Sequence, residues 1–149
     1  MQKTILVVDD ESLLVEMISR YLRAHGYAVT MANSGIEAFS FLKQIRFDLA
    51  LCDINMDGMD GFAVLAACKA VNPRTKVILC SGDIVYKTVS RVFSKGADGF
   101  LAKPFLLGEL LHQVNKCFAW EQPDSLGILA VPDQHGTPRR PEKIFCACP

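Results

Sequence analysis

The stretch ILVVDD at 5–10 is a short apolar run that ends on two carboxylates. Three later runs end at a carboxylate, a hydroxyl and an amine: LALCD at 49–53, VILCS at 77–81 and FLAK at 100–103. Runs of Val, Ile and Leu without polar alternation are typical of strands buried on both faces of a parallel sheet. Ligands of an open α/β sheet bind beyond the carboxyl ends of its strands, so these polar side chains are expected to converge.

Segments with helical periodicity separate the apolar runs, and Gly, Pro or Asn marks most of their ends. The predicted strands are 5–8, 27–31, 47–53, 76–80 and 99–102. The predicted helices are 12–23, one capped by Ser34, one capped by Asp60 that runs to Val71, 84–94 and 106–118. Strict alternation of strand and helix predicts an α/β fold with a parallel sheet covered on both faces.

Two of the predicted helices carry definite expectations about burial. Ser34 and Glu37 read as a capping box, and Ile36, Phe39 and Leu42 are expected to form the buried stripe of the helix that follows. In the first helix the expected stripe is Leu14, Met17, Ile18, Tyr21 and Leu22.

Length and composition predict one ordinary globular domain with an extension. The chain has 149 residues, 50% of them apolar and 21% charged. Sixteen basic and sixteen acidic residues cancel, so no global field favours nucleic acid or an anionic membrane. The amino terminus lacks the apolar stretch of a signal peptide, and no run approaches the ~20 residues that span a bilayer. These features predict a cytoplasmic protein without membrane insertion.

Cysteine placement agrees with a reducing compartment. Cys52, Cys68, Cys80 and Cys117 lie in apolar periodic segments and read as small buried hydrophobes. The predicted boundaries are a domain at 1–120 and a Pro- and Gly-containing extension at 121–149, with one short strand-like patch at 128–131 and no recognisable output domain. Within the extension, Cys146 and Cys148 lack the second pair that a zinc site needs and read as an incidental thiol pair.

The strand ends have the chemistry of a metal and phosphoryl site. Asp9, Asp10 and Asp53 would repel one another by about 1 kcal/mol per pair in water, and by more at lower dielectric. Mg²⁺ bound by one or two carboxylates, water and a phosphoryl group suits such a site. Lys103 offers a mobile positive charge, and Ser81 a hydrogen bond. For each residue alone, a polar side chain that merely ends a strand is the simpler interpretation. The occurrence of all of them at strand ends, in this order, favours a metal and phosphoryl site.

Four motifs together resemble the receiver domain of two-component response regulators: VVDDE at 7–11, DINMDGMDG at 53–61, CSG at 80–82 and KPF at 103–105. The resemblance covers residues 3 to 120 in register. Each motif alone is common, whereas four at this spacing are specific. The resemblance implies a flavodoxin-like, doubly wound sheet of five parallel strands in the order 2-1-3-4-5, with helices on both faces. The Lys103–Pro104 bond can adopt either isomer.

The resemblance also implies residue roles. Asp53 matches the phosphoacceptor, and Asp9 and Asp10 match the acidic pair that organises Mg²⁺. Ser81 matches the switch hydroxyl, and Lys103 matches the lysine that contacts the phosphoryl group. The output surface, by the same analogy, is built from the 84–94 helix, the last strand and the last helix.

The resemblance also implies roles for further positions, some of which carry a residue unusual in the family. Asn55 matches the residue whose backbone carbonyl binds the metal, and Phe100 matches the aromatic switch position, where the usual Tyr would add a hydroxyl. Asp57 stands where proline is usual and is expected to face solvent. Asp83 and Asn55 hold the positions that tune how fast water removes the phosphoryl group.

The predicted function is a phosphorylation-controlled receiver. A sensor histidine kinase or histidine phosphotransfer protein donates to Asp53, and a downstream protein reads the modified surface. The chain would then catalyse only its own phosphorylation and dephosphorylation. The extension is too short for a DNA-binding output domain, so no direct contact with nucleic acid is expected.

Two alternatives stay open at this stage. A pseudo-receiver would bind partners without phosphorylation, which the intact Asp53, Lys103 and acidic pair disfavour. An Mg²⁺-dependent phosphohydrolase with an aspartate nucleophile, of the haloacid-dehalogenase type, would need a second aspartate where this chain has Asn55.

Overall fold

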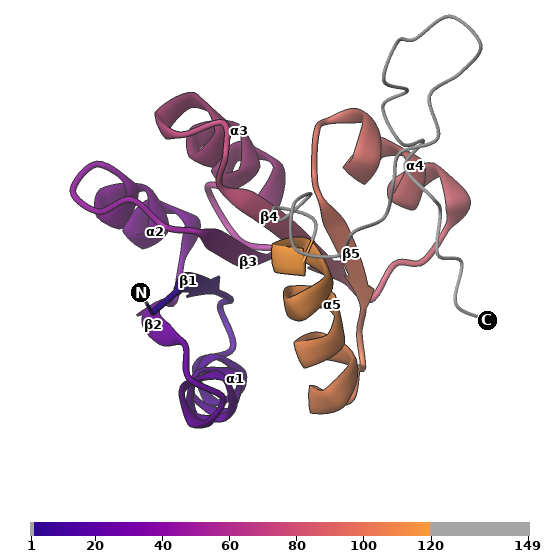
Figure 1. Ribbon diagram of the computed structural model, residues 1–149. Coiled ribbons are helices and arrows are strands. Elements are labelled where there is room, and N and C mark those ends of the chain that lie inside the picture. Colours follow the sequence, from indigo (N-terminus) through magenta and orange to yellow (C-terminus); the bar gives the residue numbers. More distant parts are fainter. Residues whose placement is uncertain (1, 120–149) are drawn as a thin grey trace, which may run out of the picture. The chain divides into compact units, whose positions relative to one another are not determined.

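The computed structural model describes residues 2–119 as five strands alternating with five helices (Figure 1). The strands are β1 (Thr4–Val8), β2 (Ala28–Ala32), β3 (Leu49–Asp53), β4 (Lys76–Ser81) and β5 (Gly99–Ala102). The helices are α1 (Ser12–Ala24), α2 (Gly35–Leu42), α3 (Gly61–Val71), α4 (Tyr86–Ser94) and α5 (Leu107–Ala119). All strand pairs are parallel and the order is β2-β1-β3-β4-β5, so the predicted fold is confirmed.

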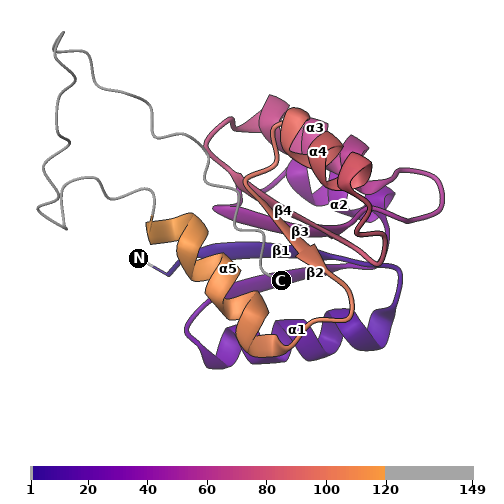
Figure 2. The same ribbon diagram turned by 90° about the vertical axis from the view of Figure 1, so that its right-hand side faces the viewer.

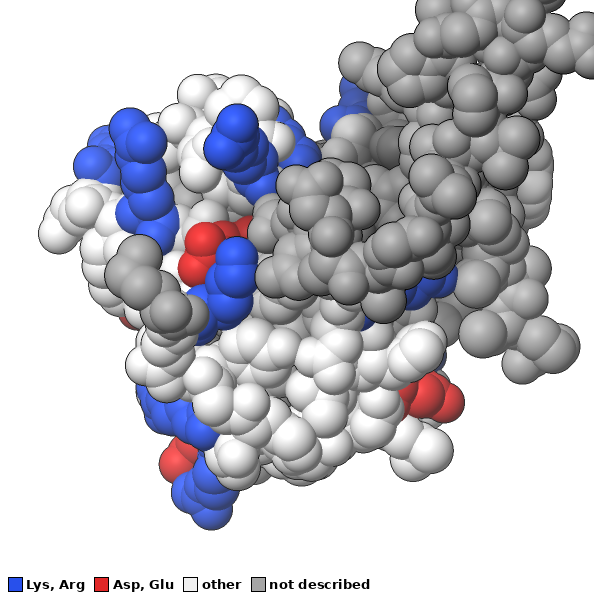
Figure 3. Space-filling model, viewed as in Figure 1, with Lys and Arg blue, Asp and Glu red and all other residues white. Residues whose placement is uncertain are grey.

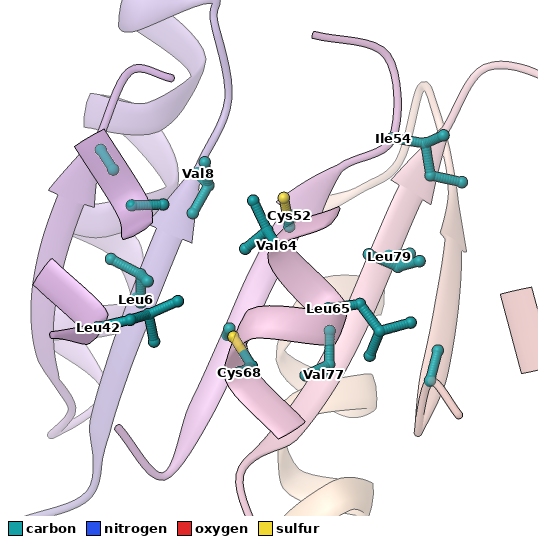
Figure 4. Close-up of a cluster of buried hydrophobic side chains, with 14 of the residues drawn as sticks. Leu6, Val8, Leu42, Cys52, Ile54, Val64, Leu65, Cys68, Val77 and Leu79 are labelled. Atoms are coloured by element: carbon teal, nitrogen blue, oxygen red, sulfur yellow. The ribbon is translucent and has the colours of Figure 1, made fainter. Parts of the chain in front are cut away.

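The sheet separates two apolar cores. Figure 2 shows α1 and α5 on one face and α2, α3 and α4 on the other. Successive strand residues point to opposite faces, so Leu6 and Val8 join one core while Ile5 and Val7 join the other. Figure 4 shows the first of these cores, where strand side chains meet α3. Helix α4 adds only Val92 to it as a buried side chain.

The burial prediction for α2 is wrong at two of three positions. Ile36 is 68% exposed and Phe39 is 37% exposed, and only Leu42 of the expected stripe is buried. The buried stripe is instead Gly35, Ala38 and Leu42. Small residues are needed on this face because the helix approaches the β3–α3 loop closely. A Cβ on Gly35 would lie 2.1 Å from the carbonyl oxygen of Met59.

Other element predictions need smaller corrections. Met17 is half-exposed, and Val15 takes its place in the buried stripe of α1. Val71 at the end of α3 is also largely exposed. Helix α4 begins at Tyr86, so Ile84 and Val85 belong to the preceding loop and are exposed. Each of these side chains fits the helical period, but the period alone does not show which face of the helix lies over the sheet.

The predicted helix caps are confirmed. The Ser34 hydroxyl accepts a hydrogen bond from the amide of Glu37 at 3.1 Å. The Glu37 carboxylate returns to the amide of Asn33, one residue earlier than in an ordinary capping box. At α3, the Asp60 carboxylate accepts from the amide of Ala63 at 2.9 Å. Two cap side chains thus satisfy amides that a helix start leaves unpaired.

The amino edge of the sheet carries a separate polar clamp. The Lys69 ammonium donates to the Asp98 carboxylate at 2.8 Å and to the carbonyl oxygen of Thr75 at 2.7 Å. Asp98 also accepts from the amide of Val77, which ties α3 to the starts of β4 and β5. Figure 3 looks onto this edge and shows blue Lys and Arg side chains beside small red areas.

Within residues 2–119, the cysteines agree with their predicted burial, since Cys52, Cys68, Cys80 and Cys117 are all buried free thiols. Burial raises the pKa of Cys68 and of Cys117 to about 11, which keeps these thiols protonated. No helix in this part of the chain is long and apolar enough to cross a bilayer. The predicted extension at 121–149, with its strand-like patch and its two cysteines, lies outside the described residues.

The start of α3 gives a test of its packing against the end of β3. A Cβ on Gly61 would lie 2.5 Å from the carbonyl oxygen of Asp53, and backbone cannot yield as a side chain would. We expect Gly61→Ala to lower the free energy of unfolding by about 1–3 kcal/mol in urea denaturation. Gly108→Ala in α5 meets nothing within 4 Å and should raise it by about 0.5–1 kcal/mol. Equal effects of the two substitutions would contradict this packing.

Candidate functional site

The four predicted strand ends meet at the carboxyl edge of the sheet. Asp9 follows β1, Asp53 ends β3, Ser81 ends β4 and Lys103 follows β5. The ladder keeps these ends level, because Asp53 pairs with Cys80 and Ser81 pairs with Ala102 in register. Parallel pairing therefore brings together residues that lie far apart in the sequence.

A partly buried ion pair lies at the centre of this edge. The Lys103 ammonium donates to the Asp9 carboxylate at 2.6 Å and lies 3.5 Å from a carboxylate oxygen of Asp53. Asp9 is 4% exposed and Asp53 is 7% exposed. The other oxygen of Asp9 accepts from the amide of Glu11 at 3.0 Å, which holds the loop before α1 against the site.

Three carboxylates form a group able to hold a cation. Oxygens of Asp9, Asp10 and Asp53 all lie within 4.8 Å of one another, with Asp9 and Asp53 buried and Asp10 exposed. A donor set made only of carboxylate oxygens suits a hard divalent cation, and the exposed Asp10 leaves a path for the hydrated ion. The residues therefore fit a metal of the Mg²⁺ or Ca²⁺ type.

The electrostatics of the site are set by burial and by the charges of Asp9, Asp53 and Lys103. Burial raises the pKa of Asp53, and the neighbouring Asp9 adds to this, against the opposing effect of Lys103. Burial alone would lower the pKa of Lys103, but the hydrogen bond and charge of Asp9, with the charge of Asp53, raise it above the ordinary value. The ammonium therefore stays charged, yet one lysine does not balance three carboxylates.

Ser81 lies in a hydrogen-bond network that starts at the acidic group. The amide of Asn55 donates to Asp53 at 3.5 Å, and the side-chain amide of Asn55 donates to the Ser81 hydroxyl oxygen at 3.4 Å. The backbone amide of Asp83 donates to the same oxygen at 3.0 Å. Because the oxygen only accepts in both bonds, the hydroxyl proton remains able to donate.

Asp83 continues this network into α4. One carboxylate oxygen accepts from the amide of Val85 at 3.1 Å, and the other accepts from the Thr88 hydroxyl at 2.9 Å. Val85, the residue before α4, provides no side-chain cap. The Asp83 carboxylate, two residues before Val85, therefore accepts the hydrogen bonds of the helix start that a capping side chain would otherwise accept.

Two implied positions lie outside the acidic group. Phe100 is half-buried and packs against the core on the face of α2, α3 and α4. Asp57 is exposed, as predicted, and does not belong to the carboxylate group. The Lys103–Pro104 bond, whose isomer the sequence left open, is cis.

Sequence reasoning missed two features beside the site. Thr88 was treated only as part of a helix, although a hydroxyl five residues after Asp83 was a possible signal for a capping bond. The second feature is a groove of about 450 Å³ between α1 and the start of α5, lined by Leu13, Glu16, Met17, Arg20, Tyr21, Ala24 and Leu107. It was missed because Met17 was assigned to the buried stripe.

Comparisons with known proteins agree on one family. The family model described as response regulator receiver domain matches residues 5–115. The transcriptional regulatory protein ZraR of Escherichia coli K12 is 36% identical over 115 residues, which are 77% of this chain and 26% of ZraR. The response regulator MprA of Mycobacterium leprae is 33% identical over 121 residues, 80% of this chain and 53% of that protein. The chain thus spans about a quarter to a half of these relatives.

Solved structures show the same fold. A CheY-like receiver domain protein from Methanospirillum hungatei superimposes with a TM-score of 0.76 at 28% identity, covering 82% of this chain and 98% of that one. A response regulator from Burkholderia pseudomallei, solved with a phosphorylated aspartic acid and a calcium ion, gives a TM-score of 0.69 at 26% identity, covering 82% and 76%. Receiver domains are signalling modules and not enzymes in the usual sense. From its sequence and its fold, the chain belongs to the response regulator receiver domain family.

Proposed function

We propose that this chain accepts a phosphoryl group on Asp53 from a histidine kinase or phosphotransfer protein and thereby switches a protein-binding surface. The observation that carries the proposal is the position of Asp53, a buried carboxylate at a strand end within 3.5 Å of a charged lysine and among two further carboxylates. A buried carboxylate with a raised pKa and a specific charged partner marks a functional position.

The proposed transfer is a single displacement at phosphorus. A carboxylate oxygen of Asp53 forms the new P–O bond while the P–N bond to the donor's imidazole breaks, and the imidazole nitrogen recovers a proton. Lys103 lies close enough to Asp53 to place its charge beside the transferred group. Catalysis then consists of positioning and charge stabilisation, as phosphoryl transfer requires.

The carboxylates of Asp9, Asp10 and Asp53, with the backbone carbonyl of Asn55, would hold Mg²⁺. When bound, the ion would neutralise negative charge on the phosphoryl oxygens and on the carboxylates themselves. The proposal rests on the carboxylates, since oxygens of Asp9, Asp10 and Asp53 lie within 4.8 Å of one another.

Ser81 is the proposed reader of the modification. Its free hydroxyl proton would turn toward a phosphoryl oxygen, and the loop that follows would move with it. Phe100 would report this movement through packing, since it lacks the hydroxyl of a tyrosine. The switched surface is α4, β5 and α5.

The proposed donor is a protein that docks on α1. The groove beside the site is lined by Leu13, Met17 and Leu107, and Leu13 is 81% exposed. The groove runs along α1 from Leu13, near the Asp9–Asp10 loop, to Ala24, so one end of a donor helix seated there would approach the acidic group. The proposed location is the cytoplasm, because the donor kinase would take its phosphoryl group from ATP.

The proposed output is through protein contacts, without direct nucleic-acid binding. Some relatives are named as transcriptional regulators, but this chain matches only about a quarter of ZraR.

We expect intact mass measurement after incubation with a small phosphodonor and Mg²⁺ to show one phosphoryl adduct. The adduct should be stable in acid and labile in base, as expected of an acyl phosphate, and Asp53→Asn should abolish it because the nucleophile is lost.

Asp57→Asn is the matched control for this experiment. It removes an exposed carboxylate from the same loop but outside the acidic group, so the adduct should persist. A wild type that binds partners but takes no phosphoryl group from either a small donor or a kinase would support the pseudo-receiver. Steady release of phosphate from unrelated phosphoesters would support the phosphohydrolase.

The raised pKa of Asp53 gives a stability prediction. A carboxyl that holds its proton more tightly in the folded state than in the unfolded state, where its pKa is about 3.9, loses stability as pH rises. We expect Asp53→Asn to raise the metal-free free energy of unfolding at pH 7, because the variant carries no charge to bury. The gain should shrink as pH falls toward 4 and should be measured by urea denaturation in chelator.

Adding Mg²⁺ separates this effect from simple packing. Binding to the folded state should stabilise the wild type more than Asp53→Asn, because the variant lacks one carboxylate ligand. Equal Mg²⁺ stabilisation of both proteins would contradict the proposed metal site. A metal-free gain for Asp53→Asn that grows at acidic pH would contradict the raised pKa of Asp53.

A further inference from the structure

We infer that Thr88 of α4 is a positioning residue that sets the lifetime of the phosphoryl group by holding the Asp83 carboxylate away from Asp53. This inference rests on the proposed phosphorylation of Asp53. Its basis is the hydrogen-bond chain from Ser81 through Asp83 to Thr88.

Asp83 is attached at both ends. Its backbone amide donates to the buried Ser81 hydroxyl oxygen at 3.0 Å, which holds the main chain of Asp83 next to Ser81. Its carboxylate oxygens accept from Val85 at 3.1 Å and from Thr88 at 2.9 Å. Both oxygens are thus occupied by groups of the α4 start, and the negative charge is held there.

The Thr88 bond is the part of this anchor that can be removed selectively. The Val85 donor is a backbone amide, whereas the Thr88 donor is one hydroxyl on a half-buried side chain. With that hydroxyl lost, one carboxylate oxygen no longer accepts from α4, and the exposed side chain can leave its present rotamer. Its attachment to Ser81 keeps it near the phosphoryl group when it does so.

A released carboxylate beside an aspartyl phosphate favours hydrolysis. It can accept a proton from a water molecule as that water attacks phosphorus; the new P–O bond forms, the P–O bond to Asp53 breaks, and inorganic phosphate leaves. While Asp83 accepts hydrogen bonds from Val85 and Thr88, these bonds compete with its acceptance of a proton from water. Thr88 therefore acts through Asp83 and never touches the reacting atoms.

The experiment measures the half-life of the Asp53 adduct after removal of the small phosphodonor, with Mg²⁺ present, by intact mass. We expect Thr88→Val, which keeps the side-chain shape, to shorten the half-life roughly three- to tenfold, since a mobile base achieves only part of the ~10²–10⁴-fold effect of a positioned one. Thr88→Ser restores the hydroxyl and should restore the half-life.

Two controls test whether Thr88 acts through Asp83. In an Asp83→Ala background, Thr88→Val should change nothing further, because the carboxylate that it releases is absent. Ser94→Ala removes a hydroxyl from the same helix, one that donates to the carbonyl oxygen of Arg91, and should leave the half-life unchanged.

An adduct with the same half-life in wild type and Thr88→Val would overturn the inference and leave the proposed function intact. The same result follows if Thr88→Val still shortens the half-life in the Asp83→Ala background, or if Ser94→Ala shortens it equally. A wild type that forms no adduct at all would overturn the proposed function, and with it the role of Thr88.

Discussion

The ion pair between Lys103 and Asp9 is the interaction on which the site depends. Strands β1 and β5 are not neighbours, since β3 and β4 lie between them, yet the Lys103 ammonium reaches Asp9 at 2.6 Å. Among residues 2–119 it is the one cation in an ion pair with the acidic group. Its charge lets two buried carboxylates share one crevice, and removing one partner of such a pair leaves an uncompensated buried charge.

Asp53 joins two parts of the site that differ in their chemistry. On one side, Asp9, Asp10 and Lys103 control charge. On the other, Asn55 and Ser81 form neutral hydrogen bonds that continue toward α4. A change of charge on Asp53 would therefore be felt by both parts at once. The first would stabilise the added charge, and the second would convert it into a movement of the chain.

The sheet and the convergence of Asp9, Asp53, Ser81 and Lys103 could be predicted because strand period and parallel topology depend on local pattern. Burial of individual helix residues could not. In α2, Ile36 has the right period and polarity, but the close approach to Met59 selects the face that carries Gly35. Such a contact joins segments distant in sequence. The Asp83 bonds to α4 were missed for a related reason, since side-chain rotamers decide them.

The weak burial of α4 has a consequence for how such a protein can diversify. Only Val92 of this helix lies in the core, whereas Tyr86, Lys87 and Arg91 are exposed. Exposed substitutions usually change stability by less than about 0.5 kcal/mol. The surface of α4 can therefore accumulate partner-specific changes while the carboxyl edge of the sheet stays the same. Under the proposed function, partner choice at the exposed face of α4 can then change at a different rate from the chemistry of the carboxyl edge.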